Sequence, residues 1–237
     1  RGLIYHGYRS MYICPRCETT LSQSEVAEGY KDAKDLSCTV KFKLQPNQKI
    51  GDFVINDSTY ILAWTTTPWT LMANVALAVG ADMDYIVVEI PANFDFKQFN
   101  VDLDLTGRYI FSPQCAAQND KLHQLLELAL QGHVPSYKFK GHDLVGLKYL
   151  PPFDFYYSQS DLANKDKGWQ VYPADFVNTE DGTGIVHIAP GFGEDDWQLA
   201  KQYDLPFVQH VKMDGTIKDE AGEWAGLNVK PKEDYQA

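Results

Sequence analysis

The chain has 237 residues, 44% of them hydrophobic, which suffices for one large domain or for one domain with an appendage. No stretch approaches the roughly 18 consecutive apolar residues of a membrane-spanning helix. The formal net charge of −11 argues against extensive binding of a nucleic-acid backbone by this chain alone, although it is compatible with contact to one or two nucleotides.

The N-terminal 35 residues are polar and rich in turns, and they contain Cys14 and Cys17 in the sequence CPRC. A CxxC pair supplies half of the four ligands of a closed structural zinc site. Either His6 and another residue complete the site, or the second pair of ligands lies outside this chain. The redox alternative needs a thioredoxin-like βαβ setting, which the surrounding sequence lacks.

The other two cysteines, Cys38 and Cys115, are isolated in the sequence. Four cysteines with a single close pair do not resemble a disulfide framework, and they favour a reducing, cytoplasmic setting. The first ten residues lack the apolar run of a signal peptide and begin without methionine, so we expect a piece of a longer protein.

Strands are predicted where β-branched and aromatic residues concentrate or alternate with polar ones, over 37–44, 59–66 and 84–90. A fourth strand is predicted over 170–177. Pro173 lacks a backbone donor, so this strand should be interrupted or lie at a sheet edge.

A helix is predicted over 119–132, with Asn119 or Asp120 as its cap and Gly132 at its end. We expect its buried face to consist of Leu122, Leu125, Leu126 and Leu130.

Residues 180–203 predict a turn, a short strand over 185–189, a glycine-rich loop and a helix from about Glu194. Strands outnumber helices and are spread along the chain, so we predict an α+β fold with a bent β-sheet or β-barrel core and peripheral helices. No GxGxxG follows a strand and GxxxxGK[ST] is absent, so no phosphate cradle for a nucleotide is predicted.

The sequence WTTTPWT (64–70) places three threonines between two tryptophans where a predicted strand ends. Pro68 cannot donate a ladder hydrogen bond, so strand pairing should fail near it. One interpretation is a strand end capped by its own hydroxyl groups. The alternative is a polar shelf, on which hydroxyl groups and free backbone N–H groups hold a water or a carbonyl oxygen beside indole walls.

The sequence GTGIVHIAPGFGEDD (182–196) combines flexible glycines with His187 in a predicted strand and three acidic residues at a helix start. His187 is either a hydrogen-bonded structural residue or part of a site. The carboxylates complement the helix dipole, and one of them could also bind a cation such as a substrate ammonium group. A catalytic metal is not expected, because HxH, HxxxH and HExxH are absent.

Together, WTTTPWTLMANVALAV (64–79) and GTGIVHIAPGFGEDDW (182–197) resemble the editing insertion of the isoleucyl-tRNA synthetase family, and 12–32 is similar to the segment leading into it. The likeness covers nearly the full chain. PWT indicates the isoleucyl branch, because valyl and leucyl relatives carry TTRPET or TTRPDT, and valyl enzymes tend to have Lys in place of His187. Phe192 departs from the pattern, since many bacterial members have His there.

The resemblance implies the α+β fold of valyl, isoleucyl and leucyl editing domains and hydrolysis of the ester in mischarged Val-tRNA(Ile). The expected partners are the valine-carrying 3′ end of tRNA(Ile) and small amino acids, without a membrane, and the chain is expected to be a monomer. Editing needs no cofactor. Zinc would be structural and complete only in a longer parent, and ATP would serve a catalytic domain whose HxGH and KMSKS motifs are missing here.

The resemblance also assigns roles to the threonine-rich segment. Thr65, Thr66 and Thr67 are expected to contact the terminal adenosine and the attacking water. Trp69 and Thr70 are expected to form a small pocket for the amino-acid side chain.

The remaining roles implied by the resemblance concern both motifs. His187 is expected to lie against the substrate and help exclude isoleucine, and Asp196 to pair with the α-ammonium group. Asn74 is expected to support the threonine shelf, while Trp64 and Gly184 are further substrate-binding candidates.

The expected division is a connecting segment over 1–35 with half a zinc knuckle, an editing domain over 36–229 and a linker over 230–237. Two rival functions stay open: a free-standing deacylase that acts in trans, and a non-catalytic module that binds the tRNA 3′ end.

Overall fold

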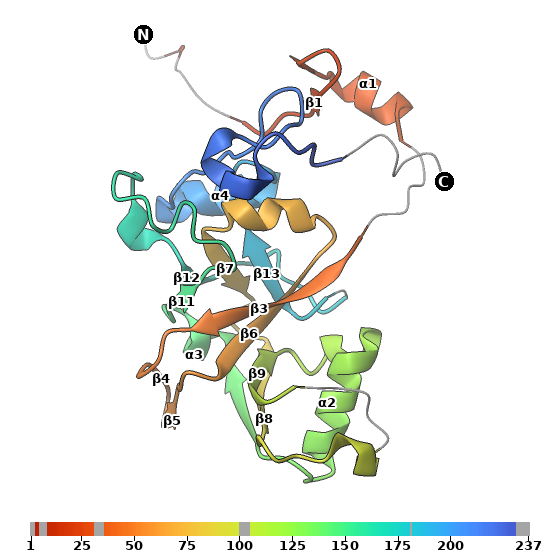
Figure 1. Ribbon diagram of the computed structural model, residues 1–237, viewed down its shortest axis with the longest axis vertical. Helices are drawn as coiled ribbons and strands as arrows, with labels where there is room; N and C mark the ends of the chain where they lie inside the picture. Colours follow the sequence, from red (N-terminus) through yellow and green to blue (C-terminus); the bar gives the residue numbers. More distant parts are fainter. Residues whose placement is uncertain (1–2, 5–8, 31–35, 100–104, 181, 231–237) are drawn as a thin grey trace.

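The computed structural model describes residues 3–4, 9–30, 36–99, 105–180 and 182–230 (Figure 1). His6, considered as a zinc ligand, lies outside these residues, as do the predicted domain boundary at 35 and nearly all of the predicted linker over 230–237.

The main sheet has six strands in the order β10-β8-β9-β6-β3-β11. Its pairs are antiparallel except that of β6 with β9, which is parallel. The bounds are β3 (Cys38–Leu44), β6 (Thr59–Thr65), β8 (Asp84–Ile90), β9 (Gly107–Phe111), β10 (Ser136–Lys140) and β11 (Tyr149–Leu150). The three strands predicted in this part of the chain are therefore confirmed to within one residue.

A second sheet of three strands has the order β12-β7-β13, with β7 (Ala76–Val79) between β12 (Gln170–Pro173) and β13 (Ile185–Ile188). The central strand β7 is buried along its whole length, which suits its unbroken apolar sequence. The strand predicted over 170–177 is shorter than expected, since it ends at Pro173, and it lies at the sheet edge as predicted.

Two small hairpins complete the strands: β1 (Ile13–Cys14) with β2 (Thr19–Thr20), and β4 (Lys49–Ile50) with β5 (Phe53–Val54). The helices are α1 (Gln23–Glu28), α2 (Asp120–Leu130), α3 (Gly141–Leu144) and α4 (Glu194–Tyr203). Short 3₁₀ segments are η1 (Pro68–Ala73), η2 (Phe96–Phe99), η3 (Cys115–Gln118), η4 (Lys165–Lys167) and η5 (Asp219–Trp224). No described helix has both the length and the hydropathy needed to cross a bilayer.

Helix α2 confirms the predicted N-terminal cap but not the predicted buried face. Asn119 caps the helix by accepting hydrogen bonds from the N–H groups of residues 121 and 122. Leu122 and Leu125 are buried as expected, whereas Leu130 is 60% exposed and Leu128 is buried instead. The face that packs on the sheet is therefore rotated toward Leu128, because two leucine rows were available and tertiary packing selected one.

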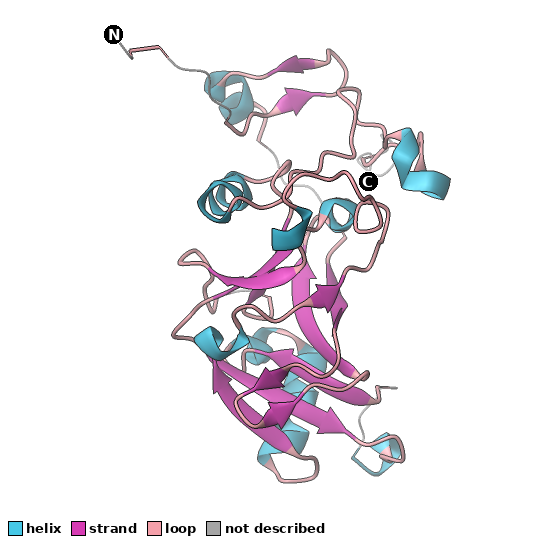
Figure 2. Ribbon diagram, turned by 90° about the vertical axis from the view of Figure 1, so that its left-hand side faces the viewer, coloured by secondary structure: helices cyan, strands magenta, loops and turns pink. Residues whose placement is uncertain are grey.

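Helix α2 lies beside β8 and β9, whereas α4 lies on the other side of β7 and β13, with β1 and α1 farther out (Figures 1 and 2). One face of the main sheet packs with α2 around Leu62, Val88 and Phe111. The other face packs toward the second sheet around Ile61 and Leu77. The α+β class with peripheral helices is confirmed. The barrel alternative is wrong for the described strands, because the six-stranded sheet is open, with β10 and the two-residue β11 at its edges.

Candidate functional site

The threonine-rich segment spans the junction between β6 and η1. Thr65 ends the strand opposite Cys38, and Pro68 occupies the start of η1. A proline is well tolerated there, because the first N–H of a helix has no intrahelical partner. The sequence thus ends the strand and turns the chain within three residues, as predicted from Pro68.

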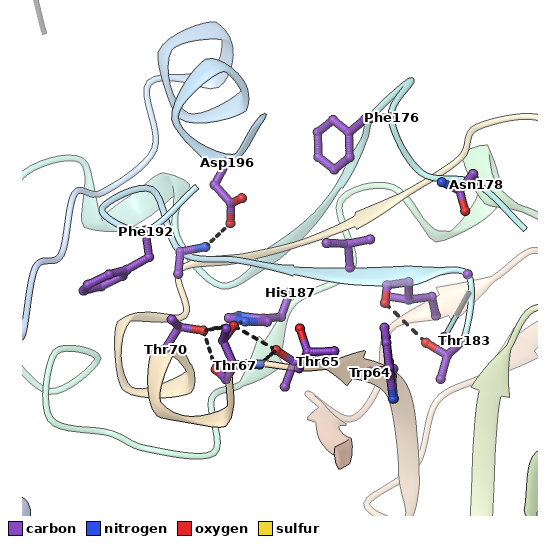
Figure 3. A pocket seen from close by; sticks show the side chains of 16 residues that line it. Trp64, Thr65, Thr67, Thr70, Phe176, Asn178, Thr183, His187, Phe192 and Asp196 are labelled. Atoms are coloured by element: carbon purple, nitrogen blue, oxygen red, sulfur yellow. Dashed lines mark hydrogen bonds between the residues drawn. The ribbon is translucent and has the colours of Figure 1, made fainter. Parts of the chain in front are cut away.

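A cavity of about 310 Å³ lies where this junction faces β13 and the start of α4 (Figure 3). It is lined by Trp64, Thr65, Thr66, Thr67, Thr70, Phe176, Asn178, Gly182, Thr183, Gly184, Ile185, Val186, His187, Ala189, Phe192 and Asp196. Both motifs that the sequence singled out therefore contribute walls to one cavity, although more than 100 residues separate them.

A chain of hydrogen bonds links the threonine hydroxyl groups. Thr67 N–H donates to Thr65 Oγ1 at 3.0 Å, and the two hydroxyl oxygens lie 3.3 Å apart. Thr67 Oγ1 lies 3.3 Å from Thr70 Oγ1, whose O–H donates to the Thr67 carbonyl oxygen at 2.8 Å. In a 3₁₀ turn residues three apart lie on the same side, so Thr67 and Thr70 share one face of η1. Thr66 is exposed at the cavity mouth.

His187 joins this network from β13, where it pairs with Leu77 of β7. Its Nε2 lies 2.9 Å from Thr70 Oγ1. With the Thr70 proton directed to the Thr67 carbonyl, Nε2–H is the donor in this contact and Nδ1 carries the lone pair. The side chain is only 8% exposed, and burial lowers the pKa of His187 to about 4. The imidazole is therefore neutral at neutral pH.

Asp196 lies in the first turn of α4, on the opposite side of the cavity from Thr70 (Figure 3). Its Oδ1 accepts a hydrogen bond from Ala189 N–H at 2.7 Å. Burial raises the pKa of Asp196 to about 6, and the Ala189 hydrogen bond opposes this shift. Glu194 and Asp195 are exposed and do not line the cavity. Of the three acidic side chains, that of Asp196 thus faces the cavity. Its carboxyl group is ionised at neutral pH and partly desolvated.

Trp69 and Asn74, two predicted site residues, do not line the cavity. Trp69 lies on a different side of the 3₁₀ turn from Thr67 and Thr70, and its indole packs edge-on against Phe192 with centroids 5.2 Å apart. Asn74 follows η1 and is buried. Its Oδ1 accepts from the Tyr149 hydroxyl at 2.6 Å and its Nδ2 donates to the Ala76 carbonyl at 2.9 Å. Asn74 therefore ties the end of η1 to Ala76 and Tyr149, and its support of the threonine shelf stays a prediction.

Gly184 lines the cavity and has a φ of +72°. A Cβ there would lie 2.5 Å from Ser112 Cβ, and the Gly184 carbonyl accepts from the Tyr85 hydroxyl at 2.7 Å. The need for glycine at this position is therefore steric, whatever part Gly184 plays in substrate binding.

Replacing Gly184 with alanine should lower the free energy of unfolding by about 2–4 kcal/mol, because positive φ and overpacking act together. The matched control is Gly146→Ala, where φ is +85° but a Cβ would meet no atom within 4 Å. That control should cost only about 1–2 kcal/mol. Denaturant unfolding of both variants measures the difference, and equal losses would show that the contact with Ser112 is not tight.

Cys14 ends β1 and Cys17 lies in the turn between β1 and β2, and neither lines the cavity. Hydrogen bonds from the backbone of Cys17 and Arg16 lower the pKa of the Cys14 thiol. Among the described residues, no third Cys, His, Asp or Glu joins them in a cluster that could hold a metal. Two thiols do not complete a structural zinc site, so the predicted half site stays a prediction.

Several cavity residues were not predicted from the sequence. Phe176 and Asn178 follow β12, and Thr183 lies in the turn before β13. Thr183 is buried, and its hydroxyl donates to the Ile185 carbonyl at 3.2 Å. No motif marks residues 176–178, since only the return of the chain beside β7 brings them to the cavity.

No family model matches the chain. Over 97% of its length it is similar to the isoleucine–tRNA ligase of Clostridium acetobutylicum, at 40% identity over 232 residues, and to that of Methanocaldococcus jannaschii, at 35% identity over 231 residues. The chain spans 18% and 20% of these relatives. The P. knowlesi cytosolic leucyl-tRNA synthetase editing domain is similar to it with a TM-score of 0.43 and 17% identity, over 73% of this chain and 66% of that one.

Proposed function

Because the chain belongs to the isoleucyl-tRNA synthetase family, as a segment that covers about a fifth of its relatives' length, we propose that it is an editing module. The proposed reaction is hydrolysis of the ester that joins valine to tRNA(Ile). The observation that carries the proposal is one cavity in which the threonine hydroxyl groups face a neutral imidazole and a half-buried carboxylate.

The chemistry of the amino acids explains why such an activity is needed. Valine lacks one methylene of isoleucine, and a binding pocket can use that difference for only about 1–3 kcal/mol, a limit for which this enzyme family is itself the standard example. A second, smaller site that accepts valine and refuses isoleucine removes the errors that binding alone cannot prevent.

The proposed hydrolysis uses a water molecule as nucleophile and needs no protein nucleophile. The water oxygen attacks the ester carbonyl carbon, the bond to the ribose oxygen breaks, and that oxygen takes up a proton. Thr65 and Thr67 offer hydroxyl groups 3.3 Å apart that can orient the water and polarise the carbonyl. Asp196 would receive the α-ammonium group and thereby fix the register of the ester.

His187 has a different place in the proposal. A neutral ring with a pKa near 4 is a weak base at neutral pH, so we assign it to the wall that limits side-chain size rather than to proton transfer. The hydrogen bond from its Nε2–H to Thr70 fixes the ring in this position.

The proposal is tested by incubating the chain with tRNA(Ile) carrying radiolabelled valine and measuring released valine, with isoleucyl-tRNA(Ile) as the reference. We expect release of valine and sparing of isoleucine. A free-standing deacylase acting in trans would show high activity at low tRNA concentration, which the net charge of −11 disfavours. A non-catalytic module would retain the tRNA and leave the ester intact.

The pH dependence of this activity follows from Asp196. Its pKa near 6 means that the carboxylate needed for the ammonium group is lost as the pH falls below about 6. We expect log kcat/KM for valyl-tRNA to bend downward near that pH, since this parameter reports groups of the free enzyme. An Asp196→Asn variant should lack the bend in its residual activity. A bend near pH 6 that persists in this variant would assign it to another group.

We further propose that hydrolysis needs no metal cofactor. Among the residues that the structure describes, the cavity offers one carboxylate and one imidazole, whose Nε2 is already engaged with Thr70. Dialysis against EDTA should therefore leave valine release within about twofold of the untreated chain, whereas a metal hydrolase would stop. A large loss that is restored by one divalent cation would overturn this part of the proposal.

A further inference from the structure

The ring of His210 packs with the rings of Trp69 and Phe192 beside the cavity. His210 follows α4 in the sequence, is 0% exposed and does not line the cavity. Its ring lies 5.0 Å from the Phe192 ring and 6.5 Å from the Trp69 ring, while Trp69 and Phe192 are 5.2 Å apart. Only Phe192 of the three reaches the cavity, where it lies near Thr70 and Asp196 (Figure 3).

His210 is also hydrogen-bonded to the threonine side of the cavity. Its Nε2–H donates to the Trp69 carbonyl oxygen at 2.9 Å. That carbonyl belongs to the peptide unit whose N–H is the Thr70 amide, and the Thr70 amide donates to the Thr67 carbonyl at 2.9 Å. One rigid peptide plane is therefore held from both sides, and it carries the Thr70 side chain that meets His187.

The glycine-rich loop on the other side of the cavity rests on the same segment. A Cβ at Gly191 would lie 2.8 Å from the Val208 carbonyl oxygen, so the backbones of 191 and 208 are in close contact. Phe192 follows directly, and its N–H donates to the Ala189 carbonyl at 2.9 Å. The segment is itself fixed, since Lys218 N–H donates to the His210 carbonyl at 2.8 Å.

We propose that His210 is a positioning residue that sets the width of the cavity for the amino-acid side chain. Its N–H group holds the Trp69–Thr70 peptide plane, and its ring supports Phe192 from behind. The Thr70 side and the Phe192 side of the cavity then keep a fixed separation. The inference rests on the proposed function for its substrate, an aminoacyl ester with a small aliphatic side chain.

Two substitutions separate the two contacts of His210. His210→Phe keeps a ring beside Phe192 and loses the donor to Trp69. His210→Gln places an amide N–H close to the position of Nε2 and loses the ring. Leu128→Ala is the control for general destabilisation, because it removes a buried side chain of the α2 core that does not line the cavity. All variants are assayed on valyl-tRNA(Ile) and isoleucyl-tRNA(Ile), and their amide hydrogen exchange is measured by peptide.

We expect His210→Phe to lower kcat on the valyl ester by about tenfold or more and also to lower the preference for valine, since the partly buried Trp69 carbonyl loses its donor and the Thr70 side of the cavity loosens. His210→Gln should keep kcat within about threefold and lower the preference for valine over isoleucine by about tenfold, since Phe192 loses its support. Exchange should accelerate in the peptide over 68–74 for His210→Phe and in that over 189–193 for His210→Gln, and in neither for Leu128→Ala.

The inference is overturned if both His210 variants keep wild-type exchange in these peptides, or if both slow the two esters by one common factor as Leu128→Ala does. Absence of valine release by the unmutated chain would instead contradict the proposed function. In that case hydrogen exchange still decides whether His210 positions the two walls.

Discussion

Replacing Asp196 with asparagine is expected to reduce hydrolysis of valyl-tRNA(Ile) by about 100-fold or more. The variant keeps the shape of the side chain and an oxygen that can accept the hydrogen bond from Ala189 N–H. This hydrogen bond is 2.7 Å long in the wild type. It loses the negative charge that would meet the α-ammonium group, and a charge-assisted hydrogen bond in a partly dry site contributes about 1.5–3 kcal/mol or more. Single-turnover measurement of valine release gives the loss directly.

The same variant should be at least as stable as the wild type at neutral pH. The pKa of Asp196 is raised from 3.8 to about 6 in the folded chain, so the folded state favours the protonated carboxyl group. This contribution to stability is fully present below about pH 4 and is lost as the pH rises through 6, at a cost of up to about 3 kcal/mol. The melting temperature of Asp196→Asn relative to wild type should therefore increase between pH 4 and pH 7.5.

Asp195→Asn is the matched control, because Asp195 lies in the same helical turn but is exposed and outside the cavity. It should retain activity and lose about 0.3–1 kcal/mol of stability, because its charge complements the helix dipole. If Asp196→Asn behaved in the same way, active but less stable, Asp196 would be a helix-start residue only and the assignment to the ammonium group would be wrong.

Replacing His187 with alanine is expected to extend hydrolysis to the cognate ester, isoleucyl-tRNA(Ile), by about 10–100-fold over the wild type. Forcing one additional methylene against a closed wall costs about 1–3 kcal/mol, and removal of the buried ring abolishes that cost. Valyl-tRNA(Ile) should still be hydrolysed at a rate within about tenfold of the wild type, since Thr65, Thr67 and Asp196 stay in place. Parallel deacylation assays on the two esters measure both effects.

The opposite result distinguishes a chemical role for His187 from a steric one. If His187 were a general base, its loss would slow both esters by about 100-fold or more, without any gain toward isoleucine. His187→Gln serves as the control, because it retains bulk and an N–H group near Thr70 and should keep the discrimination. A gain toward isoleucine in the glutamine variant as well would mean that the ring does not form the limiting wall.

The local pattern of the sequence was sufficient to predict where the regular elements lie. Alternation of apolar residues identified β3, a concentration of β-branched and aromatic residues identified β6 and β8, and a run of acidic residues after glycine identified the start of α4. These signals are reliable because each depends on residues only two to four positions apart, within one strand or one turn.

The same local signals could not select between equivalent faces. In α2, either row of leucines could have been buried, and contact with β8 and its neighbours selected the row that contains Leu128. Around η1, the family resemblance placed Trp69 and Thr70 together in one pocket, but three residues per turn direct Thr70 into the cavity and Trp69 toward Phe192 and His210.

The amino-acid sequence by itself determined the α+β class, the ends of the principal strands, and the two motifs that build the cavity. Only the tertiary structure decided that Thr70 contacts His187, 117 residues away, and that Asp196 rather than Asp195 faces the cavity. It also decided that His210 contacts both the Trp69 carbonyl and the Phe192 ring. The physical reason is that burial sets these properties. The pKa values of His187 and Asp196, like the separation of the cavity walls, depend on which elements exclude water from a side chain, and distant strands and loops make that choice.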